Sequence, residues 1–222
     1  MKNRLLAFSL TLAFASTPSL LYADGMASAG KEKAVSCGSC HGGDGNSMVS
    51  TFPKLAQQHE SYLIKQLKNF KDGSRKDAMM SAMAMSLSDE DIADIAAYYA
   101  DQKITPNQLP VIDSDDEDKQ SVAKEEEAAQ TLIKQGSDLY RNGDLGREVS
   151  ACIACHGPQG EGNKPAGFPV LRSQHADYLI KALSDFKSGA RSNNPENVMH
   201  MIAKKMTLEE IKAVSYRISM MK

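Results

Sequence analysis

Two copies of one five-residue pattern constrain this chain of 222 residues more than any other feature. Residues 37–41 read Cys-Gly-Ser-Cys-His and residues 152–156 read Cys-Ile-Ala-Cys-His, which uses all four cysteines of the protein. Cys-x-x-Cys-His is the attachment pattern of a c-type haem, in which two thiols on one helical turn bond to the porphyrin and the His binds its iron. The pattern therefore predicts two covalently attached haem c groups. The predicted attachment residues are Cys37, Cys40, Cys152 and Cys155, with His41 and His156 as the proximal iron ligands.

The first 23 residues have the composition of a secretory signal peptide. Lys2 and Arg4 precede an uncharged apolar stretch from Leu5 to Ala15, and Ala23 is a small residue suited to cleavage. The stretch is short for a bilayer-spanning helix of about 20 residues, which favours cleavage over a retained membrane anchor. We therefore expect residues 1–23 to be removed and the mature chain to be periplasmic, because covalent c-haem is attached on the outer side of the bacterial inner membrane.

Charge is distributed unevenly over the mature chain. Residues 24–105 carry 9 basic and 11 acidic side chains, residues 106–128 carry 2 and 8, and residues 129–222 carry 13 and 9. The mature chain therefore has more acidic than basic side chains, which excludes a nucleic-acid-binding protein, because such a protein is typically basic. A dense acidic run is typical of a solvated linker. We expect an N-terminal domain over 24–105, an acidic linker over 106–128 and a C-terminal domain over 129–222. The opposite domain charges would orient the molecule against partners, unless the charge balance merely drifts between the halves.

The two halves also repeat each other beyond the haem motif. Phe-Pro-x-Leu occurs at 52–55 and 168–171, Gln-His at 58–59 and 174–175, and Tyr-Leu-Ile-Lys at 62–65 and 178–181. Two copies at a nearly constant offset indicate a tandem duplication rather than a repeat array. The fold class predicted from this repetition is all-α, with two similar domains that are each wrapped around one haem.

The helices expected in each copy follow the same order. In the first copy they cover about 31–40 and 59–71, and in the second about 125–142 and 176–187. A loop that carries methionines follows in both copies. The last helix of each copy begins at a capping-box pattern, Ser88 with Asp91 and Thr207 with Glu210. We find no convincing β-strand in the sequence.

The second axial ligand of each iron decides between electron transfer and catalysis, because a Met opposite the His raises the reduction potential and closes the iron. Met80 lies seven residues before Leu87, and Met199 lies seven residues before Met206, so the two occupy equivalent positions ahead of the last helix. This offset-consistent pair predicts Met80 and Met199 as the distal ligands.

Other ligands remain open at this point. Met79 and Met83 are alternatives in the first copy, and His200 is a rival in the second, although Ser81 stands at its position in the first. The matched pair His59 and His175 is predicted to make polar contacts at helix starts rather than to bind iron.

The matched pair Arg75 and Arg191 could bind haem propionates, since a guanidinium pairs bidentately with a carboxylate, or could be plain surface charges.

These motifs resemble those of the dihaem cytochromes c4, each half being similar to a class I cytochrome c. The elements that carry the likeness are Cys-x-x-Cys-His-Gly, Asp44-Gly45-Asn46, Phe-Pro-x-Leu, Gln-His-x-x-Tyr-Leu, Phe-Lys-x-Gly-x-Arg, the methionine loop and the last helix. The resemblance implies a pseudo-twofold axis between the domains, with the propionate edges of the haems facing each other. It also implies His/Met ligation of both irons, and that the carbonyls of Pro53 and Pro169 orient His41 and His156. The acidic linker is longer than the family's usual connection, which leaves the packing of the two domains open.

The resemblance implies a periplasmic electron carrier in respiration, often loosely attached to the membrane, and not an enzyme. Its redox partners would be a cytochrome bc1 complex or another donor and a terminal oxidase as acceptor, and we expect a monomer. Two other functions compete with this prediction. One is a dihaem enzyme with one open iron site, such as a peroxidase or a sulfur-oxidising dehydrogenase. The other is a cytochrome subunit of a periplasmic dehydrogenase.

Overall fold

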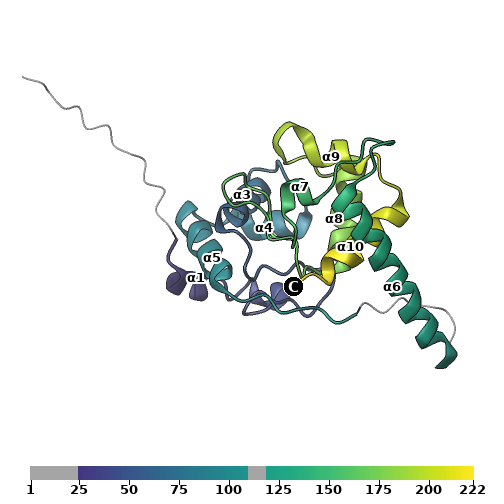
Figure 1. The fold of residues 1–222 in the computed structure, drawn as a ribbon. Coiled ribbons are helices and arrows are strands. Elements are labelled where there is room, and N and C mark those ends of the chain that lie inside the picture. Colours follow the sequence, from purple (N-terminus) through teal and green to yellow (C-terminus); the bar gives the residue numbers. More distant parts are fainter. Residues whose placement is uncertain (1–24, 110–118) are drawn as a thin grey trace, which may run out of the picture.

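The computed structural model describes residues 25–109 and 119–222, so the expected signal peptide lies outside the described residues (Figure 1). The helices of the N-terminal domain are α1 (Ala27–Lys33), α2 (Gly38–His41), α3 (Glu60–Lys71), α4 (Ala78–Met85) and α5 (Asp89–Asp101). Those of the C-terminal domain are α6 (Lys119–Asn142), α7 (Ile153–His156), α8 (Ala176–Ser188), the 3-10 turn η1 (Pro195–Asn197), α9 (Val198–Ala203) and α10 (Leu208–Ser219). Two isolated β-bridges, and no strand, occur in the described part of the chain. The all-α prediction is confirmed.

The helices differ from the expected ones in three places. The helix expected over 31–40 is two short helices, α1 and α2, and the methionine segments expected as loops are helices α4 and α9. Helix α6 begins at Lys119, within the segment expected as a linker, of which residues 110–118 lie outside the described residues. Both predicted capping boxes are present, at Ser88 and at Thr207, and they fix the starts of α5 and α10.

In each domain the first helix crosses the last one at a glycine. A methyl group added at Gly30 of α1 would lie 1.9 Å from the Asp94 carbonyl oxygen of α5. A methyl group added at Gly136 of α6 would lie 2.0 Å from the Ala213 carbonyl oxygen of α10. Both crossings are therefore backbone-to-backbone contacts that leave no room for a side chain.

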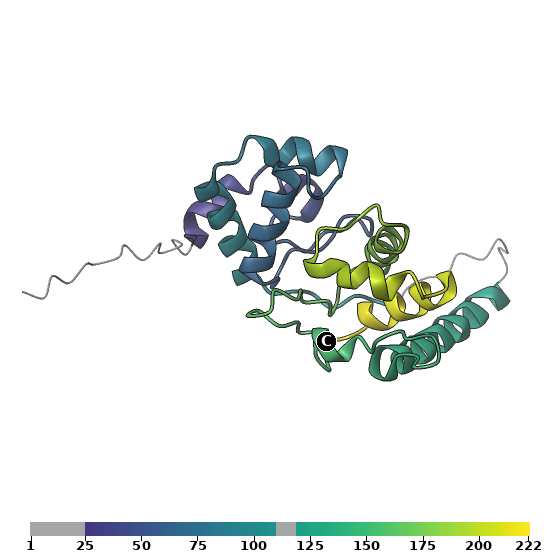
Figure 2. The same cartoon turned by 90° about the horizontal axis from the view of Figure 1, so that it is seen from above.

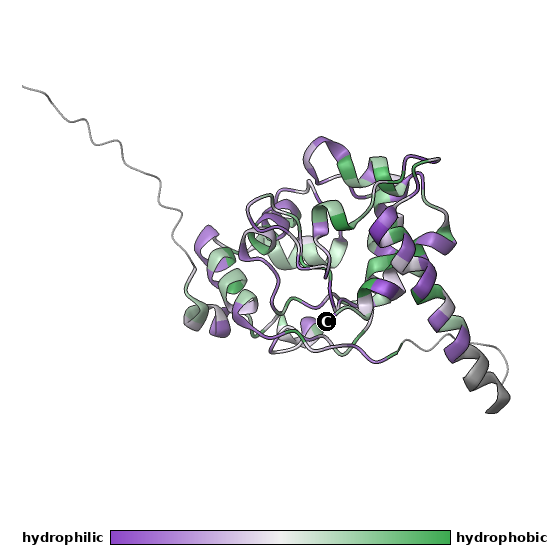
Figure 3. Ribbon diagram, viewed as in Figure 1, coloured by the Kyte–Doolittle hydropathy of each residue, from purple (hydrophilic) through white to green (hydrophobic). Residues whose placement is uncertain are grey.

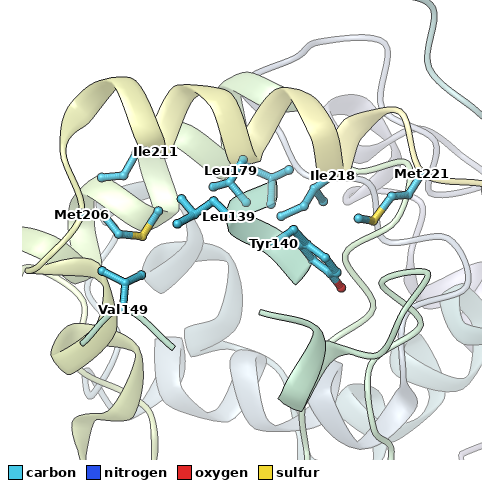
Figure 4. Close-up of a cluster of buried hydrophobic side chains, with 9 residues drawn as sticks. Leu139, Tyr140, Val149, Leu179, Met206, Ile211, Ile218 and Met221 are labelled. Carbon is cyan, nitrogen blue, oxygen red and sulfur yellow. The ribbon is translucent and has the colours of Figure 1, made fainter. Parts of the chain in front are cut away.

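The C-terminal core lies where α6, α8 and α10 meet (Figure 4). Its buried members come from all three helices, from the segments between them and from the residues after α10: Leu139, Tyr140, Val149, Leu179, Met206, Ile211, Val214, Ile218 and Met221. Apolar and polar residues alternate along the helices (Figure 3). Cys152 packs against this core, and Cys37 packs against a smaller N-terminal core of Ala34, Leu63, Ile95, Ala96 and Tyr99. Each haem motif is thus built against the core of its own domain.

The two domains lie side by side, joined by a reciprocal pair of glutamine contacts (Figure 2). The Gln174 side chain accepts from the Lys54 backbone N–H at 2.8 Å and donates to the Lys54 carbonyl at 2.9 Å. The Gln58 side chain does the same with Val170, at 2.9 Å in both directions. Both glutamines are buried. Because Lys54 and Val170 occupy equivalent positions, these contacts obey the pseudo-twofold relation that the resemblance implies, and the longer linker does not keep the domains apart.

Within the described residues, no helix is both long enough and apolar enough to cross a membrane.

Candidate haem-binding sites

The two Cys-x-x-Cys-His motifs form matching helical turns, α2 and α7. Cys37 and Cys152 are the residues just before these helices, so the two thiols of each motif lie one helical turn apart. All four cysteines are free, and burial raises the pKa of the Cys37 thiol and raises that of Cys152 to about 11. Cys37 and Cys152 are therefore protonated thiols packed against the apolar cores of their domains.

Both histidines of the motifs are buried and held by the carbonyl of a proline. His41 Nδ1 lies 2.9 Å from the Pro53 oxygen, and His156 Nδ1 lies 3.1 Å from the Pro169 oxygen, as the resemblance implied. Burial lowers the pKa of both histidines, so each ring is neutral. Since Nδ1 must carry the proton that it donates to the carbonyl, the lone pair is left on Nε2, the atom that binds a metal. The thiol pair and this Nε2 together form the donor set that a haem c requires.

In the N-terminal domain, the structure favours Met80 among the methionines of α4. Met79, Met83 and Met85 are 54%, 41% and 69% exposed, whereas Met80 is partly buried. Its backbone N–H donates to the Asp77 side chain at 3.0 Å, which places Met80 in the first turn of the helix. Met79 and Met83 thus point towards solvent, and Met80 remains the predicted distal ligand.

The C-terminal domain repeats this arrangement at Met199. Met199 is partly buried, and its backbone N–H donates to the Asn194 side chain at 2.9 Å, as Met80 does to an Asp. Met201 is 47% exposed, and Met206 belongs to the core. Met199 remains the predicted distal ligand of the second iron.

The remaining histidines make other contacts. His200 Nδ1 lies 2.7 Å from the Phe186 carbonyl near the end of α8. His59 and His175 precede α3 and α8 as expected, but neither side chain caps its own helix. Instead, His175 Nε2 donates to the Ser47 carbonyl of the other domain at 2.8 Å. The expected polar contact of His175 thus crosses the domain interface.

Arg75 and Arg191 stack on aromatic rings and meet at the interface. Their guanidinium carbons lie 4.4 Å from the Phe70 ring centre and 4.5 Å from the Phe186 ring centre. Arg191 is buried, at 8% exposure, so it is not a plain surface charge. Among the described residues neither Arg forms an ion pair with a carboxylate, and a buried cation without one is costly. A haem propionate at each guanidinium would supply the missing negative charge.

Tyrosines from both domains surround these arginines. Arg191 donates to the Tyr62 hydroxyl at 2.9 Å and to Gln66 Oε1 at 3.0 Å, and Arg75 donates to the Tyr178 hydroxyl at 3.2 Å. Burial raises the pKa of Tyr178, but the two guanidinium groups outweigh it and lower the pKa to about 8. Among the described residues, the two guanidinium groups make this interface strongly electropositive, which suits the carboxylates of two haems.

Several residues of this interface had no role in the sequence analysis. Gln58 and Gln174 were matched as a repeat, and Gln66 was not singled out at all. The repeated Gln-His pair was visible in the sequence, but nothing in the sequence indicates that these glutamines are buried against the opposite domain.

Comparisons with known proteins match both halves. The family model for cytochrome c matches residues 27–103 and again residues 133–218. Cytochrome c4 of Pseudomonas aeruginosa is 41% identical over 216 residues, which cover 97% of this chain and 96% of that protein. The crystal structure of reduced recombinant cytochrome c4 from Pseudomonas stutzeri superposes with a TM-score of 0.78 at 40% identity, over 89% of this chain and 100% of that one. A thiosulfate dehydrogenase electron acceptor of Thiomonas intermedia is 33% identical over 82% of this chain and 77% of its own length. This chain belongs to the cytochrome c4 family, whose members are dihaem electron-transfer proteins.

Proposed function

We propose that the mature protein is a periplasmic electron carrier that delivers electrons to a terminal oxidase. When bound, the two haems supply one-electron redox chemistry at their irons. The chain's own contribution is to hold each haem by two thiols, to present a neutral His Nε2 on one side, and to place a partly buried Met for the other side. The single observation that carries the proposal is the repetition of this arrangement in both domains.

The repetition matters because a catalyst needs one iron that can bind its substrate. His41 and Met80 in the first domain have equivalents in His156 and Met199 in the second. Each His donates to a proline carbonyl, and each Met N–H donates to a polar side chain, Asp77 in one domain and Asn194 in the other. Neither domain departs from the pattern in a way that would free one iron for catalysis. Ligation by His and Met in both domains would close both irons, which favours a carrier over a dihaem enzyme.

Ligation and function can be tested on the mature holoprotein. The oxidised protein should show the weak far-red Met–iron absorption for both haems, and the reduced protein should bind carbon monoxide poorly. The reduced protein should then be reoxidised by membranes of its host in a cyanide-sensitive reaction. Rapid carbon monoxide binding at one iron would favour the enzyme, and a lack of cyanide-sensitive reoxidation would contradict delivery to an oxidase.

The location is tested by fractionation. Cells that express the full chain should yield a haem-containing protein in the periplasmic fraction. A variant that lacks residues 1–23 should remain in the cytoplasm without haem. Haem attachment in that variant would contradict the export step.

A second candidate function is that of a dedicated electron acceptor for a dehydrogenase. The relative in Thiomonas intermedia favours it, since that protein is named as the electron acceptor of a thiosulfate dehydrogenase. Mixing the oxidised holoprotein with a thiosulfate dehydrogenase and thiosulfate should reduce both haems if this function applies. Co-purification with the dehydrogenase in a fixed ratio would favour a dedicated subunit over a diffusing carrier.

A further inference from the structure

We propose that Gln58 and Gln174 are positioning residues, each of which tunes the reduction potential of the haem in the opposite domain. Each glutamine would act through the single peptide group that holds the axial histidine of that haem. The inference requires His41 and His156 to be iron ligands, but it does not depend on which partner the protein serves.

The contact in the N-terminal domain runs through the peptide group between Pro53 and Lys54. Its carbonyl oxygen accepts from His41 Nδ1 at 2.9 Å. Its N–H, on the Lys54 side, donates to Gln174 Oε1 at 2.8 Å. Both hydrogen-bonding groups of this peptide are therefore occupied, its oxygen by the predicted axial ligand and its N–H by the second domain. We call it the relay peptide, and the chain of hydrogen bonds from glutamine through it to histidine the relay.

The C-terminal domain contains the same relay, with the roles of the two domains exchanged. The peptide group between Pro169 and Val170 accepts from His156 Nδ1 at 3.1 Å and donates to Gln58 Oε1 at 2.9 Å. Each domain thus supplies the amide acceptor for the other domain's histidine-holding peptide.

The glutamines are fixed in the orientation that the relay needs. Gln58 and Gln174 are 7% and 6% exposed. Each Nε2 donates to the carbonyl that follows the relay peptide, at 2.9 Å, so the amide cannot turn over without losing both bonds. Each Oε1 also accepts from the N–H of the next residue, His59 or His175, at 3.0 Å, which ties the side chain to the start of its own helix.

Hydrogen bonds in such a chain strengthen one another, by roughly 10–30% per bond. When the peptide N–H donates to glutamine, electron density shifts towards the carbonyl oxygen, which becomes a better acceptor for the histidine N–H. A more strongly held Nδ1–H makes the imidazole more basic and a better donor to iron. A better donor stabilises the oxidised iron, so the glutamine lowers the reduction potential of the haem across the interface.

A merely structural role for the glutamines predicts the opposite sign. If their loss only loosened the interface, water would reach the haems and stabilise the more highly charged oxidised state. The potentials of the two haems would then fall, and the change would not be confined to one of them. The direction of the shift and the haem that shows it therefore separate tuning from packing.

The test is an optically detected redox titration of the holoproteins Gln174→Met and Gln58→Met, which keep side-chain length but remove all three hydrogen bonds of the amide. Gln174→Met should favour reduction of the N-terminal haem by about twofold to threefold, a rise of about 20–30 mV at 59 mV per tenfold. Gln58→Met should do the same to the C-terminal haem alone. Proton NMR of the haem methyl groups assigns each potential to its domain.

Asn107→Ala is the matched control. The Asn107 side chain donates to the backbone carbonyls of Ser173, Gln174 and Ser219, so its loss weakens contacts with the second domain without touching either relay peptide. The reduction potentials of both haems should not rise in Asn107→Ala. A rise in Asn107→Ala equal to that in Gln174→Met, unchanged potentials in both glutamine variants, or a fall of both potentials would each overturn the proposal.

Gln174→Glu keeps the proposal testable if the Met variant does not fold. Glutamate retains an acceptor for the Lys54 N–H and, when protonated at this buried position, a donor for the Lys54 carbonyl. The potential of the N-terminal haem should therefore fall or stay constant in Gln174→Glu, and a rise would refute the relay.

Discussion

Replacing Gly136 by alanine tests the backbone contact between α6 and α10. The added methyl group would lie 2.0 Å from the Ala213 carbonyl oxygen, 2.4 Å from its carbonyl carbon and 2.9 Å from Val214 Cα. Ordinary contact begins at 3.4 Å, so the helices would have to separate by more than about 1 Å. All three neighbours are backbone atoms, which cannot turn aside as a side chain can.

The expected destabilisation follows from two opposing effects. Overpacking of this kind costs up to about 3 kcal/mol. Alanine gains about 1 kcal/mol over glycine inside a helix. The net loss is therefore about 2 kcal/mol, which corresponds to a decrease in Tm of roughly 8–16 °C for a domain of this size.

Thermal unfolding of the holoprotein, followed by far-UV circular dichroism, measures this loss. Gly146→Ala is the matched control in the same domain, because Gly146 is exposed and an added methyl would approach only the Asp144 side chain, at 3.4 Å. If Gly136→Ala and Gly146→Ala have the same Tm, the close approach of the two helices is not as the structure describes it.

Two further predictions concern the iron ligands and the N-terminal helix crossing. Met80→Ala or Met199→Ala should open one iron to carbon monoxide and lower that haem's potential on the order of 0.1 V, a fraction of the ~0.8 V that axial ligands span; an unchanged far-red absorption in either variant would refute that ligand. Asp94→Asn should lower the Tm at pH 7, because the Asp94 carboxylate accepts from Lys33 Nζ and from the Met26 N–H, both at 2.7 Å. The Lys33 ammonium and the Met26 N–H lower the pKa of Asp94, so its stabilisation is complete above the ordinary carboxyl pKa of about 3.9 and is lost as the pH falls through the lowered value. The difference in Tm between the two proteins should therefore shrink in acid, and a difference that persists at low pH would contradict this ion pair.

The sequence analysis was most successful where a feature depends on a few consecutive residues. The haem turns and the capping boxes at Ser88 and Thr207 depend on spacings of three or four residues, and the structure contains them as predicted. The Phe-Pro carbonyl contacts came from the resemblance, because the loops between His and Pro differ in length and no local rule brings them together.

The errors came from giving composition more weight than helix propensity. Residues 78–85, Ala-Met-Met-Ser-Ala-Met-Ala-Met, consist mainly of strong helix formers, yet their place before a capping box suggested a loop. The helix expected from residue 125 begins six residues earlier, at Lys119, inside the segment that its acidic composition had assigned to the linker.

The domain interface could not be derived from any local pattern. Lys54 and Gln174 are 120 positions apart, and Gln58 and Val170 are 112 apart, so only the folded arrangement brings them together. The same holds for Gly30 and Gly136. That these positions have no room for a side chain becomes clear only when the partner helix is in place.

The reciprocal glutamine contacts also bear on why the two domains share one polypeptide. Two separate chains that associated through this interface would lose about 4–15 kcal/mol of translational and rotational freedom, which the contacts between them would have to offset. A covalent connection replaces that loss by an effective concentration of one half around the other. Docking of the two halves is then first order and independent of how much protein the cell makes. Cutting the chain between them would make docking second order, and the pair would separate on dilution.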